Sequence, residues 1–249
     1  MSFNTLGLSD ALLKAVSKQG YTTPSPIQKK AIPLILERKD VLASSQTGTG
    51  KTAGFTLPML QILSQGQQLH QRPIRALILT PTRELAAQVY ENVKDYSAFL
   101  DIRSMVIFGG VNQRPQVATL RQGIDILIAT PGRLLDLHNQ GMLSLKSIEI
   151  LVLDEADRML DMGFLRDIKK IMALMPSKRQ NLLFSATFSK EIKALANDIL
   201  HHPVLVEATP ENTTVEAIDQ IVYRVAKGLK PDLLVKLISE GKWEQVLVF

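Results

Sequence analysis

The stretch SSQTGTGKT ends as a phosphate-binding loop does, with a glycine, a lysine and a threonine in succession. In the general pattern G-x-x-x-x-G-K-[ST], Gly50 and Lys51 fill the last glycine and lysine positions, and Ser45 stands where the first glycine belongs. Gly48 and Gly50 would let backbone amides approach the phosphates of a nucleotide. Lys51 would then reach the β- and γ-phosphates, and the Thr52 hydroxyl would hold Mg²⁺. The alternative is a glycine-rich turn that only starts a helix, and the GKT ending disfavours it.

An acidic group ends the apolar run in the stretch ILVLDEAD. Asp154 would order the metal through water, and the adjacent Glu155 would orient or deprotonate an attacking water. The alternative is that these acids only solvate the end of a strand. Because the sequence also contains a phosphate loop, we favour a catalytic role for these acids. We predict that Lys51, Asp154 and Glu155 are catalytic and that Thr52 and Asp154 are the metal-binding residues.

Two kinds of segment must position these residues. From residue 40 to about residue 207, short β-rich runs alternate with amphipathic segments, which is the spacing of βα units around a buried parallel sheet. The predicted strands are DVLAS, IRALILT, IRSMVIF, IDILIAT, IEILVLD, QNLLFSA and PVLVEA. The predicted helices between them cover 83–99, 114–122, 133–139, 164–175 and 190–200. We predict a doubly wound α/β fold with a mainly parallel sheet, helices on both faces and a ligand crevice at the carboxyl ends of the strands.

Both flanks differ from this core. A helical segment at 9–19 precedes GYTTPSPIQ, whose glycine and two prolines predict a turn before another helix. Residues 208–217 are polar and rich in Pro and Thr, as linkers are. Strand-like QIVYRVA, helix-like PDLLVKLISEG and strand-like EQVLVF follow. We therefore expect one complete domain over 1–207, a linker over 208–217 and the truncated start of a second domain over 218–249.

Composition limits the classes of protein that fit. With 45% hydrophobic and 21% charged residues among 249, the chain matches a globular protein rather than a disordered one. The absence of cysteine removes disulfide frameworks and thiolate metal sites, and no apolar run approaches a membrane span, so we expect a cytoplasmic protein without membrane partners. The net charge of +5 favours a polyanionic partner such as nucleic acid, although a charge of this size also serves solubility.

The order of the short motifs identifies a family. GYTTPSPIQ, SSQTGTGKT, PTRELA, GG, TPGR, DEAD and SAT occur in the order seen in the DEAD-box ATP-dependent RNA helicases, which this sequence resembles over nearly all of residues 3–207. The sequence stretches SQTGTGKTAGFTLPML and NLLFSATF most resemble those of the bacterial RhlE-like branch. The resemblance implies a RecA-like fold of the P-loop NTPase type, with ATP and Mg²⁺ as cofactors. It also accounts for Ser45, because this family commonly has a small residue at that position.

The resemblance extends the nucleotide site beyond the loop. It implies that Gln28 reads adenine, and an amide can pair with a ring nitrogen and the exocyclic amine together. It places Phe3 and Tyr21 beside the base, with ordinary core packing as the alternative for both aromatic residues. The predicted ATP-binding residues are Phe3, Tyr21, Gln28, Ser45, Gln46, Thr47, Gly48, Thr49, Gly50, Lys51 and Thr52.

Three further motifs resemble the RNA-contacting motifs of the family. Each follows a strand and precedes a helix, so backbone amides and side chains there could meet phosphates without reading bases. The alternatives are helix capping by the threonines and surface charge for the arginines. The predicted RNA-binding residues are Pro81, Thr82, Arg83, Gly109, Gly110, Thr130, Pro131, Gly132 and Arg133.

The motif SAT resembles the family's coupling motif. The resemblance places Ser185 and Thr187 to hydrogen-bond Asp157 and so to link the phosphate state to the grip on RNA. The alternative is that these hydroxyls only satisfy backbone groups.

Together these features predict the first domain of an RNA helicase that unwinds short duplexes with coupled ATP hydrolysis. We expect a largely sequence-independent RNA partner and, for this chain alone, nucleotide binding and weak RNA binding without unwinding, since the second RecA-like domain is missing. We expect a monomer, with dimerisation through the unpaired final strand as an alternative. The rival functions are a nucleotide-responsive RNA-binding or assembly module without catalysis, and a DNA-directed or translocating motor.

Overall fold

The computed structural model describes residues 2–44, 48–66, 72–207 and 221–248 of the chain. They belong to two compact units, Met1–Pro210 and Glu211–Phe249. The predicted linker, 208–217, lies outside the described residues.

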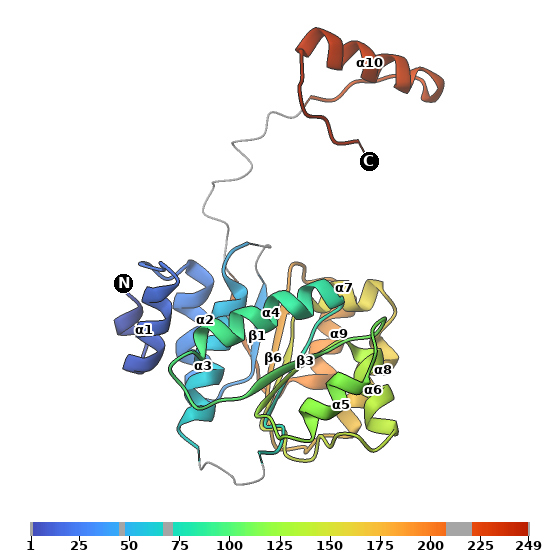
Figure 1. Cartoon of the computed structure of the whole chain (residues 1–249). Helices are drawn as coiled ribbons and strands as arrows, with labels where there is room; N and C mark the ends of the chain where they lie inside the picture. Colours follow the sequence, from blue (N-terminus) through green and yellow to red (C-terminus); the bar gives the residue numbers. More distant parts are fainter. Residues whose placement is uncertain (1, 45–47, 67–71, 208–220, 249) are drawn as a thin grey trace. The chain divides into compact units, whose positions relative to one another are not determined.

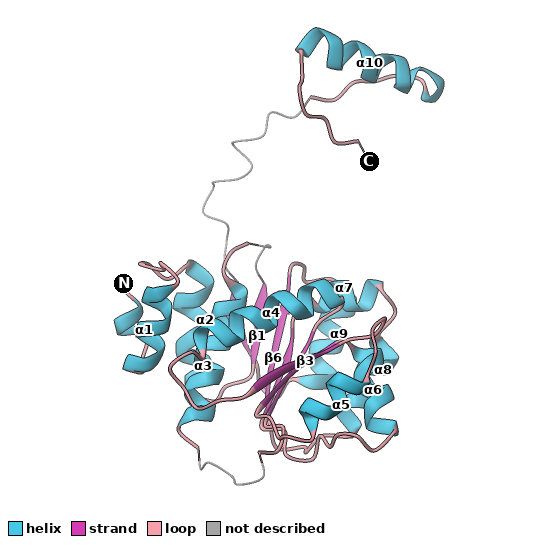
Figure 2. Ribbon diagram, in the orientation of Figure 1, coloured by secondary structure: helices cyan, strands magenta, loops and turns pink. Residues whose placement is uncertain are grey.

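The first unit is built on a seven-stranded sheet (Figure 2). The strands are β1 (Val41–Ser44), β2 (Ala76–Leu79), β3 (Ser104–Ile107), β4 (Ile126–Ala129), β5 (Ile150–Leu153), β6 (Gln180–Ser185) and β7 (Val204–Glu207). Their order in space is β3-β4-β2-β5-β6-β1-β7, and every described pairing is parallel. Each strand falls within one of the seven predicted runs, which confirms the predicted parallel α/β sheet.

Helices cover both faces of this sheet (Figure 1). They are α1 (Asp10–Lys18), α2 (Pro26–Leu36), α3 (Lys51–Ser64), α4 (Arg83–Tyr96), α5 (Arg114–Leu120), α6 (Pro131–Asn139), α7 (Ala156–Asp161), α8 (Leu165–Ala173) and α9 (Lys190–Ile199). Helices α1 to α4 contribute to one apolar cluster and α5 to α9 to a second. Alternate residues of each central strand, such as Ile78 and Leu79, enter opposite clusters, so strands buried on both faces read as continuous apolar runs.

Helix α7 was not among the predicted helices. It begins directly after Glu155 and ends before Gly163, whose φ of 80° is in the left-handed region. A six-residue helix shows too little of the 3.6-residue period to stand out in the sequence. The segment after the acidic motif is therefore two short helices, α7 and α8, rather than one.

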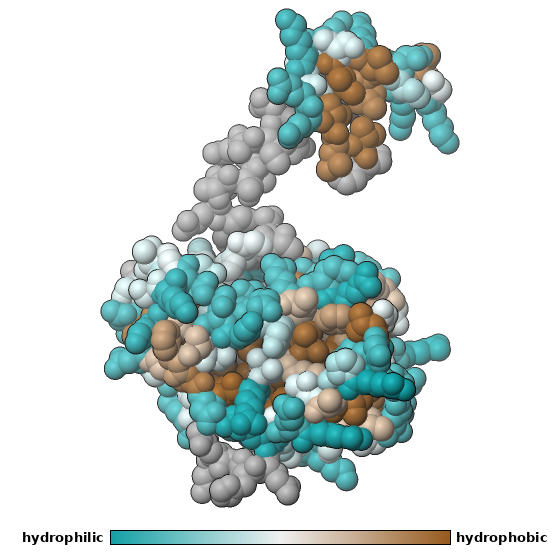
Figure 3. Space-filling model, viewed as in Figure 1, coloured by the Kyte–Doolittle hydropathy of each residue, from teal (hydrophilic) through white to brown (hydrophobic). Residues whose placement is uncertain are grey.

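The described part of the second unit, residues 221–248, contains a 3₁₀ turn (Lys227–Leu229) and helix α10 (Lys230–Gly241). The helix confirms the reading of PDLLVKLISEG. The strands predicted at QIVYRVA and EQVLVF are wrong for the described residues 221–226 and 244–248, which form no strand. A strand requires a neighbour for its backbone groups, and an apolar pattern alone does not supply one. Apolar side chains of this unit gather on one side (Figure 3), and Val222, Leu247 and Trp243 are exposed.

The amino edge of the sheet is fixed by ion pairs. Arg75 Nε lies 2.6 Å from Glu149 Oε1, and Arg72 Nη1 lies 2.9 Å from Asp125 Oδ2. These pairs join residues shortly before β2, β4 and β5, so they lie at the edge of the sheet opposite the carboxyl ends of the strands.

None of the helices described is both long and apolar enough to cross a membrane.

Candidate functional site

Most of the predicted site residues that the structure describes follow strands at the carboxyl edge of the sheet or begin the helices after them. The phosphate loop follows β1, and the acidic motif follows β5. PTRELA, GG, TPGR and SAT follow or end β2, β3, β4 and β6. In a sheet whose strands are all parallel, the loops after the strands meet at one edge, which is where ligands of this fold class bind.

Two glycines shape the described part of the phosphate loop. Gly48 has a φ of 79° and Gly50 a φ of 87°, a region that penalises a Cβ. Gly50 is the N-cap of α3, so the free amides of that helix start face the loop. Lys51 begins α3 and is only 8% exposed. The predicted contacts Ser45, Gln46 and Thr47 lie outside the described residues.

The acidic motif lies at the end of β5 in an unusual backbone turn. Asp154 is 3% exposed, and burial raises the pKa of its carboxyl to about 7; the Lys51 ammonium opposes this rise and the Glu155 carboxylate adds to it. Glu155 has φ 52° and ψ 52°, and its N–H donates to Asp154 Oδ1 at 3.1 Å. Its side chain pairs with Arg158 at 3.3 Å. A left-handed glutamate is a strained conformation of the kind found at functional sites.

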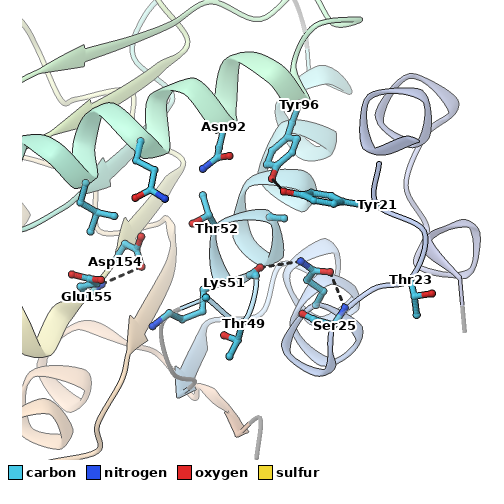
Figure 4. Close-up of a pocket in the computed structure, with 16 residues that line it drawn as sticks. Tyr21, Thr23, Ser25, Thr49, Lys51, Thr52, Asn92, Tyr96, Asp154 and Glu155 are labelled. Carbon is cyan, nitrogen blue, oxygen red and sulfur yellow. Dashed lines mark hydrogen bonds between the residues drawn. The ribbon is translucent and has the colours of Figure 1, made fainter. Parts of the chain in front are cut away.

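A pocket of about 580 Å³ brings these groups together (Figure 4). Lys51, Thr52 and Asp154 all line it, and Thr49, Gly48 and Gly50 form its loop side. Separate elements supply the three key side chains, since the first two start α3 and the third directly follows β5. The pocket thus combines a cation, a hydroxyl and a buried carboxyl beside a helix start, the groups that a magnesium-bound triphosphate requires.

Gln28 and Tyr21 also line this pocket, and Tyr21 lies on the side away from Asp154 and Glu155 (Figure 4). The Gln28 side chain accepts from Ser25 N–H at 2.9 Å and donates to the Gly50 carbonyl at 3.0 Å. Tyr21 is 42% exposed, so much of its side chain is open to solvent. Phe3 does not line the pocket; it is 4% exposed and belongs to the core cluster of α1 to α4, as its alternative reading proposed.

Helix α4 supplies a wall of this pocket that sequence reasoning missed. Leu85, Gln88, Asn92 and Tyr96 line it. They recur at helical spacing on one face of α4. That spacing was visible in the sequence, but the folded sheet is needed to show that this face lies over the phosphate loop.

A second pocket of about 550 Å³ lies among the predicted RNA-binding motifs. The predicted residues that line it are Pro81, Thr82, Arg83, Gly109, Thr130, Gly132 and Arg133. Sequence reasoning missed four more residues of its wall, which are Glu84, Asp136, Met162 and Phe164. Gly110 and Pro131 do not line the pocket; Gly110 has a φ of 79° in the loop after β3, and Pro131 starts α6. The structure therefore joins three motifs that are far apart in sequence.

The threonines and arginines of this pocket have different surroundings. Thr82 caps α4 by accepting from Leu85 N–H at 3.2 Å, as its alternative reading proposed, whereas Thr130 starts α6 without such a bond. The Arg83 side chain is 60% exposed and pairs with Glu84. The Arg133 side chain is only 11% exposed and donates to the Val111 carbonyl at 3.1 Å. Arg83 is thus the accessible cation, and Arg133 supports the loop after β3.

Asp157 joins α7 to the end of β6. Its Oδ2 accepts from the backbone N–H groups of Ala186 and Thr187 at 3.1 Å each and from the Thr187 hydroxyl at 3.3 Å. Ser185 is fully buried and accepts from Thr187 N–H at 3.4 Å. No hydrogen bond joins Ser185 to Asp157 within the described part of the chain, so the direct contact predicted for Ser185 is wrong. Its position inside β6, paired with Ser44, holds it within the sheet.

Comparisons with known proteins agree with this arrangement. The model of the DEAD/DEAH box helicase family matches residues 25–195. The chain is 42% identical over its whole length to "ATP-dependent RNA helicase CshA" of Limosilactobacillus reuteri, covering 49% of that protein. It is 40% identical to "DEAD-box ATP-dependent RNA helicase RhpA" of Helicobacter pylori (strain B128), again over its whole length and 49% of the relative. The chain thus spans about half the length of these curated relatives.

A solved structure is similar in both fold and sequence. It is a DEAD box protein from the hyperthermophile Methanococcus jannaschii, with a TM-score of 0.79 and 37% identity. The similarity covers 96% of this chain and 63% of the other. The family match spans more than half of the residues and includes the phosphate loop, the acidic motif and the second pocket. The chain belongs to the DEAD/DEAH box helicase family.

Proposed function

We propose that this chain binds ATP with Mg²⁺ in the larger pocket and acts as the ATP-binding half of an ATP-dependent RNA helicase. The observation that carries the proposal is the convergence of Lys51, Thr52 and Asp154 on one pocket that Gln28 also lines. The phosphate end explains binding of any nucleoside triphosphate. The Gln28 amide favours adenine, because it offers one donor and one acceptor side by side.

The residues present suit a divalent ion. Asp154 is buried and its pKa is raised, so its charged form lacks sufficient compensation from the chain alone. A cation held by Asp154, through water, and by the Thr52 hydroxyl would supply that compensation. When bound, Mg²⁺ would neutralise charge on the β- and γ-phosphates.

The protein groups then have distinct tasks in hydrolysis. Lys51 holds the β- and γ-phosphates, and the amides at the start of α3 face them. Glu155 orients the attacking water and accepts its proton. Its left-handed backbone turns the residue out of β5 at the wall of the pocket instead of continuing the strand.

RNA would bind along the second pocket, with Arg83 as the accessible phosphate-binding cation. Contacts there would be with the RNA backbone, so we propose weak sequence preference. The bonds from Asp157 to Ala186 and Thr187 connect the acidic motif to the loop after β6 and support a coupling role for Asp157 and Thr187.

We further propose that residues 218–249 begin a second RecA-like domain. The exposed apolar side chains of this unit support the proposal, because such surface is ordinarily covered. Arginines from a second domain would stabilise charge on the transferred phosphoryl group, an effect worth about 10³–10⁵ in rate. Residues 1–249 alone should therefore bind nucleotide and weakly bind RNA, without unwinding. Membership of the RhlE-like branch stays a prediction from the two sequence stretches that resemble it.

The test measures ATP turnover and duplex separation by residues 1–249 and by the full-length protein, each with RNA, with DNA and with neither. We expect RNA-stimulated turnover and local opening of short duplexes only in the full-length protein. Robust turnover and unwinding by residues 1–249 would contradict the proposed division of labour. RNA binding without turnover in the full-length protein would indicate an assembly module, and stronger stimulation by DNA than by RNA would indicate a DNA-directed motor.

A further inference from the structure

Tyr21 reaches the base end of the nucleotide pocket from a short connection between α1 and α2. Its backbone is fixed, because Gly20 turns the chain with a φ of 77° and the Tyr21 N–H donates to the Val16 carbonyl at 3.2 Å. Its side chain is 42% exposed and is therefore not fixed by surrounding core. Something else must hold the ring if it is to serve as a wall for a base.

Tyr96 supplies that hold from the last turn of α4. The two tyrosine hydroxyls are 3.2 Å apart and share a hydrogen bond across 75 residues of sequence (Figure 4). The ring centroids are 6.3 Å apart with an interplanar angle of 55°, so the rings contact at an angle and do not stack. Tyr96 is 2% exposed and packs in the core cluster of α1 to α4, which makes it the rigid member of the pair.

The pair lines the same pocket as Gln28, the residue that we assign to adenine. Both ends of the Gln28 amide are already held by backbone groups. The amide fixes the edge of a base, while an aromatic ring offers a face for it to lie against. A ring that is held in one rotamer before the ligand arrives loses less entropy on binding.

We infer that Tyr96 is a positioning residue for the base of the nucleotide, which acts by holding the ring of Tyr21 in the pocket. This rests on the proposed function and deepens it by assigning base recognition to a residue of α4. The contribution belongs to the base end only, because the phosphate end is formed by α3, the loop before α3 and the turn after β5.

Calorimetric titration with ADP and with inorganic tripolyphosphate, both with Mg²⁺, separates the two ends. Tyr96→Phe keeps the ring and removes the shared hydrogen bond. We expect it to weaken ADP binding about two- to tenfold, the worth of one neutral hydrogen bond, and to leave tripolyphosphate binding unchanged. Tyr21→Phe removes the same bond from the other side, so the double variant should bind ADP no worse than the weaker single variant.

Tyr90→Phe is the matched control. Tyr90 is also on α4 but lines a different pocket, and its hydroxyl has no hydrogen bond within the described residues. It should leave the binding of both ligands unchanged. Unchanged ADP binding in Tyr96→Phe, or an equal loss for ADP and tripolyphosphate, would overturn the inference while leaving the proposed function intact. Absence of ADP binding in the unmodified chain would overturn both.

Discussion

Gln28 Nε2 donates to the Gly50 carbonyl oxygen at 3.0 Å, so the residue assigned to adenine lies directly against the loop assigned to phosphates. A Cβ built on Gly50 would collide with this same amide. The bond from Ser25 N–H to Gln28 Oε1 fixes which end of the amide is the acceptor. In the proposed function, recognition of the base and of the phosphates would therefore depend on this one close approach of Gln28 to the Gly50 backbone.

Gly50→Ala should lose nucleotide binding by more than the strain of the substitution explains. The new methyl group would displace Gln28, and a φ of 87° adds about 1–2 kcal/mol of strain. We expect ADP affinity to fall at least about tenfold, measured by calorimetry. Gly141→Ala is the control, because Gly141 has a φ of 70° but open space around it. It should lower stability and leave ADP affinity unchanged; equal losses in both variants would contradict the role of Gln28.

Asp154 should make the stability of the ligand-free chain fall as pH rises. Its pKa is about 7 in the folded chain and about 4 when unfolded, so between these values the folded chain binds more protons than the unfolded chain. The loss between pH 4 and pH 8 would be up to about 4 kcal/mol. Asp154→Asn should remove this dependence, whereas Asp161→Asn, at an exposed position, should keep it. Denaturant unfolding in EDTA at several pH values measures the effect, and a pH slope that survives in Asp154→Asn would refute it.

Two substitutions at Glu155 should separate its chemistry from its backbone strain. Glu155→Gln removes the base and keeps the unfavourable left-handed side chain, so we expect turnover of the full-length protein to fall about 100-fold or more with unchanged ADP binding and stability. Glu155→Asn also removes the base, but asparagine tolerates φ near 52° better. It should be equally inactive and more stable by about 1 kcal/mol. Turnover near that of the unmodified protein in either variant would remove Glu155 from the mechanism.

Thr187→Ala should uncouple RNA from ATP turnover. It deletes the hydroxyl bond to Asp157 and keeps the two backbone bonds, so ADP binding should persist while RNA stimulation falls. Ser189→Ala is the control in the same loop, because Ser189 caps α9 by accepting from Ile192 N–H and has no hydrogen bond to Asp157 in the described part of the chain. Steady-state turnover of the full-length protein at increasing RNA concentrations measures the coupling. A greater loss of stimulation in Ser189→Ala than in Thr187→Ala would count against the coupling role.

The two arginines of the second pocket should differ in salt dependence. Arg83→Ala should weaken RNA binding and reduce the slope of log affinity against log salt by about 0.7, the value of one phosphate contact on a single strand. Arg133→Ala should instead lower stability by about 1–2 kcal/mol, because the side chain is mostly buried and holds the Val111 carbonyl. Fluorescence anisotropy at several salt concentrations and thermal unfolding test both. The reverse pattern would show that Arg133 is the phosphate contact.

Much of this architecture could be predicted because its signals are local. Each strand is a short apolar run, and the parallel arrangement brings every following loop to one edge. The positions of Lys51, Thr52 and Asp154 in one pocket follow from that geometry. The assignment of Gln28 to the base required a resemblance, since a lone glutamine carries no signal of its own.

The features that escaped prediction depend on contacts between distant segments. The bond between Tyr21 and Tyr96 joins two elements whose approach is set by packing of α1 and α4. The left-handed turn at Glu155 is imposed by the passage from β5 to α7 and contradicts the local preference of glutamate. The prediction of the C-terminal strands was wrong for a related reason. An apolar pattern leads to strand pairing only when a partner strand is present.

The ion pairs at the amino edge of the sheet also define a place for attachment. Because the chain contains no cysteine, Ser147→Cys in the exposed turn before β5 would create a unique thiol on the side remote from both pockets. A fluorophore or a surface tether attached to this thiol would leave both the nucleotide pocket and the RNA pocket open. The amino edge of the sheet is therefore a suitable attachment site for single-molecule measurements of ligand binding.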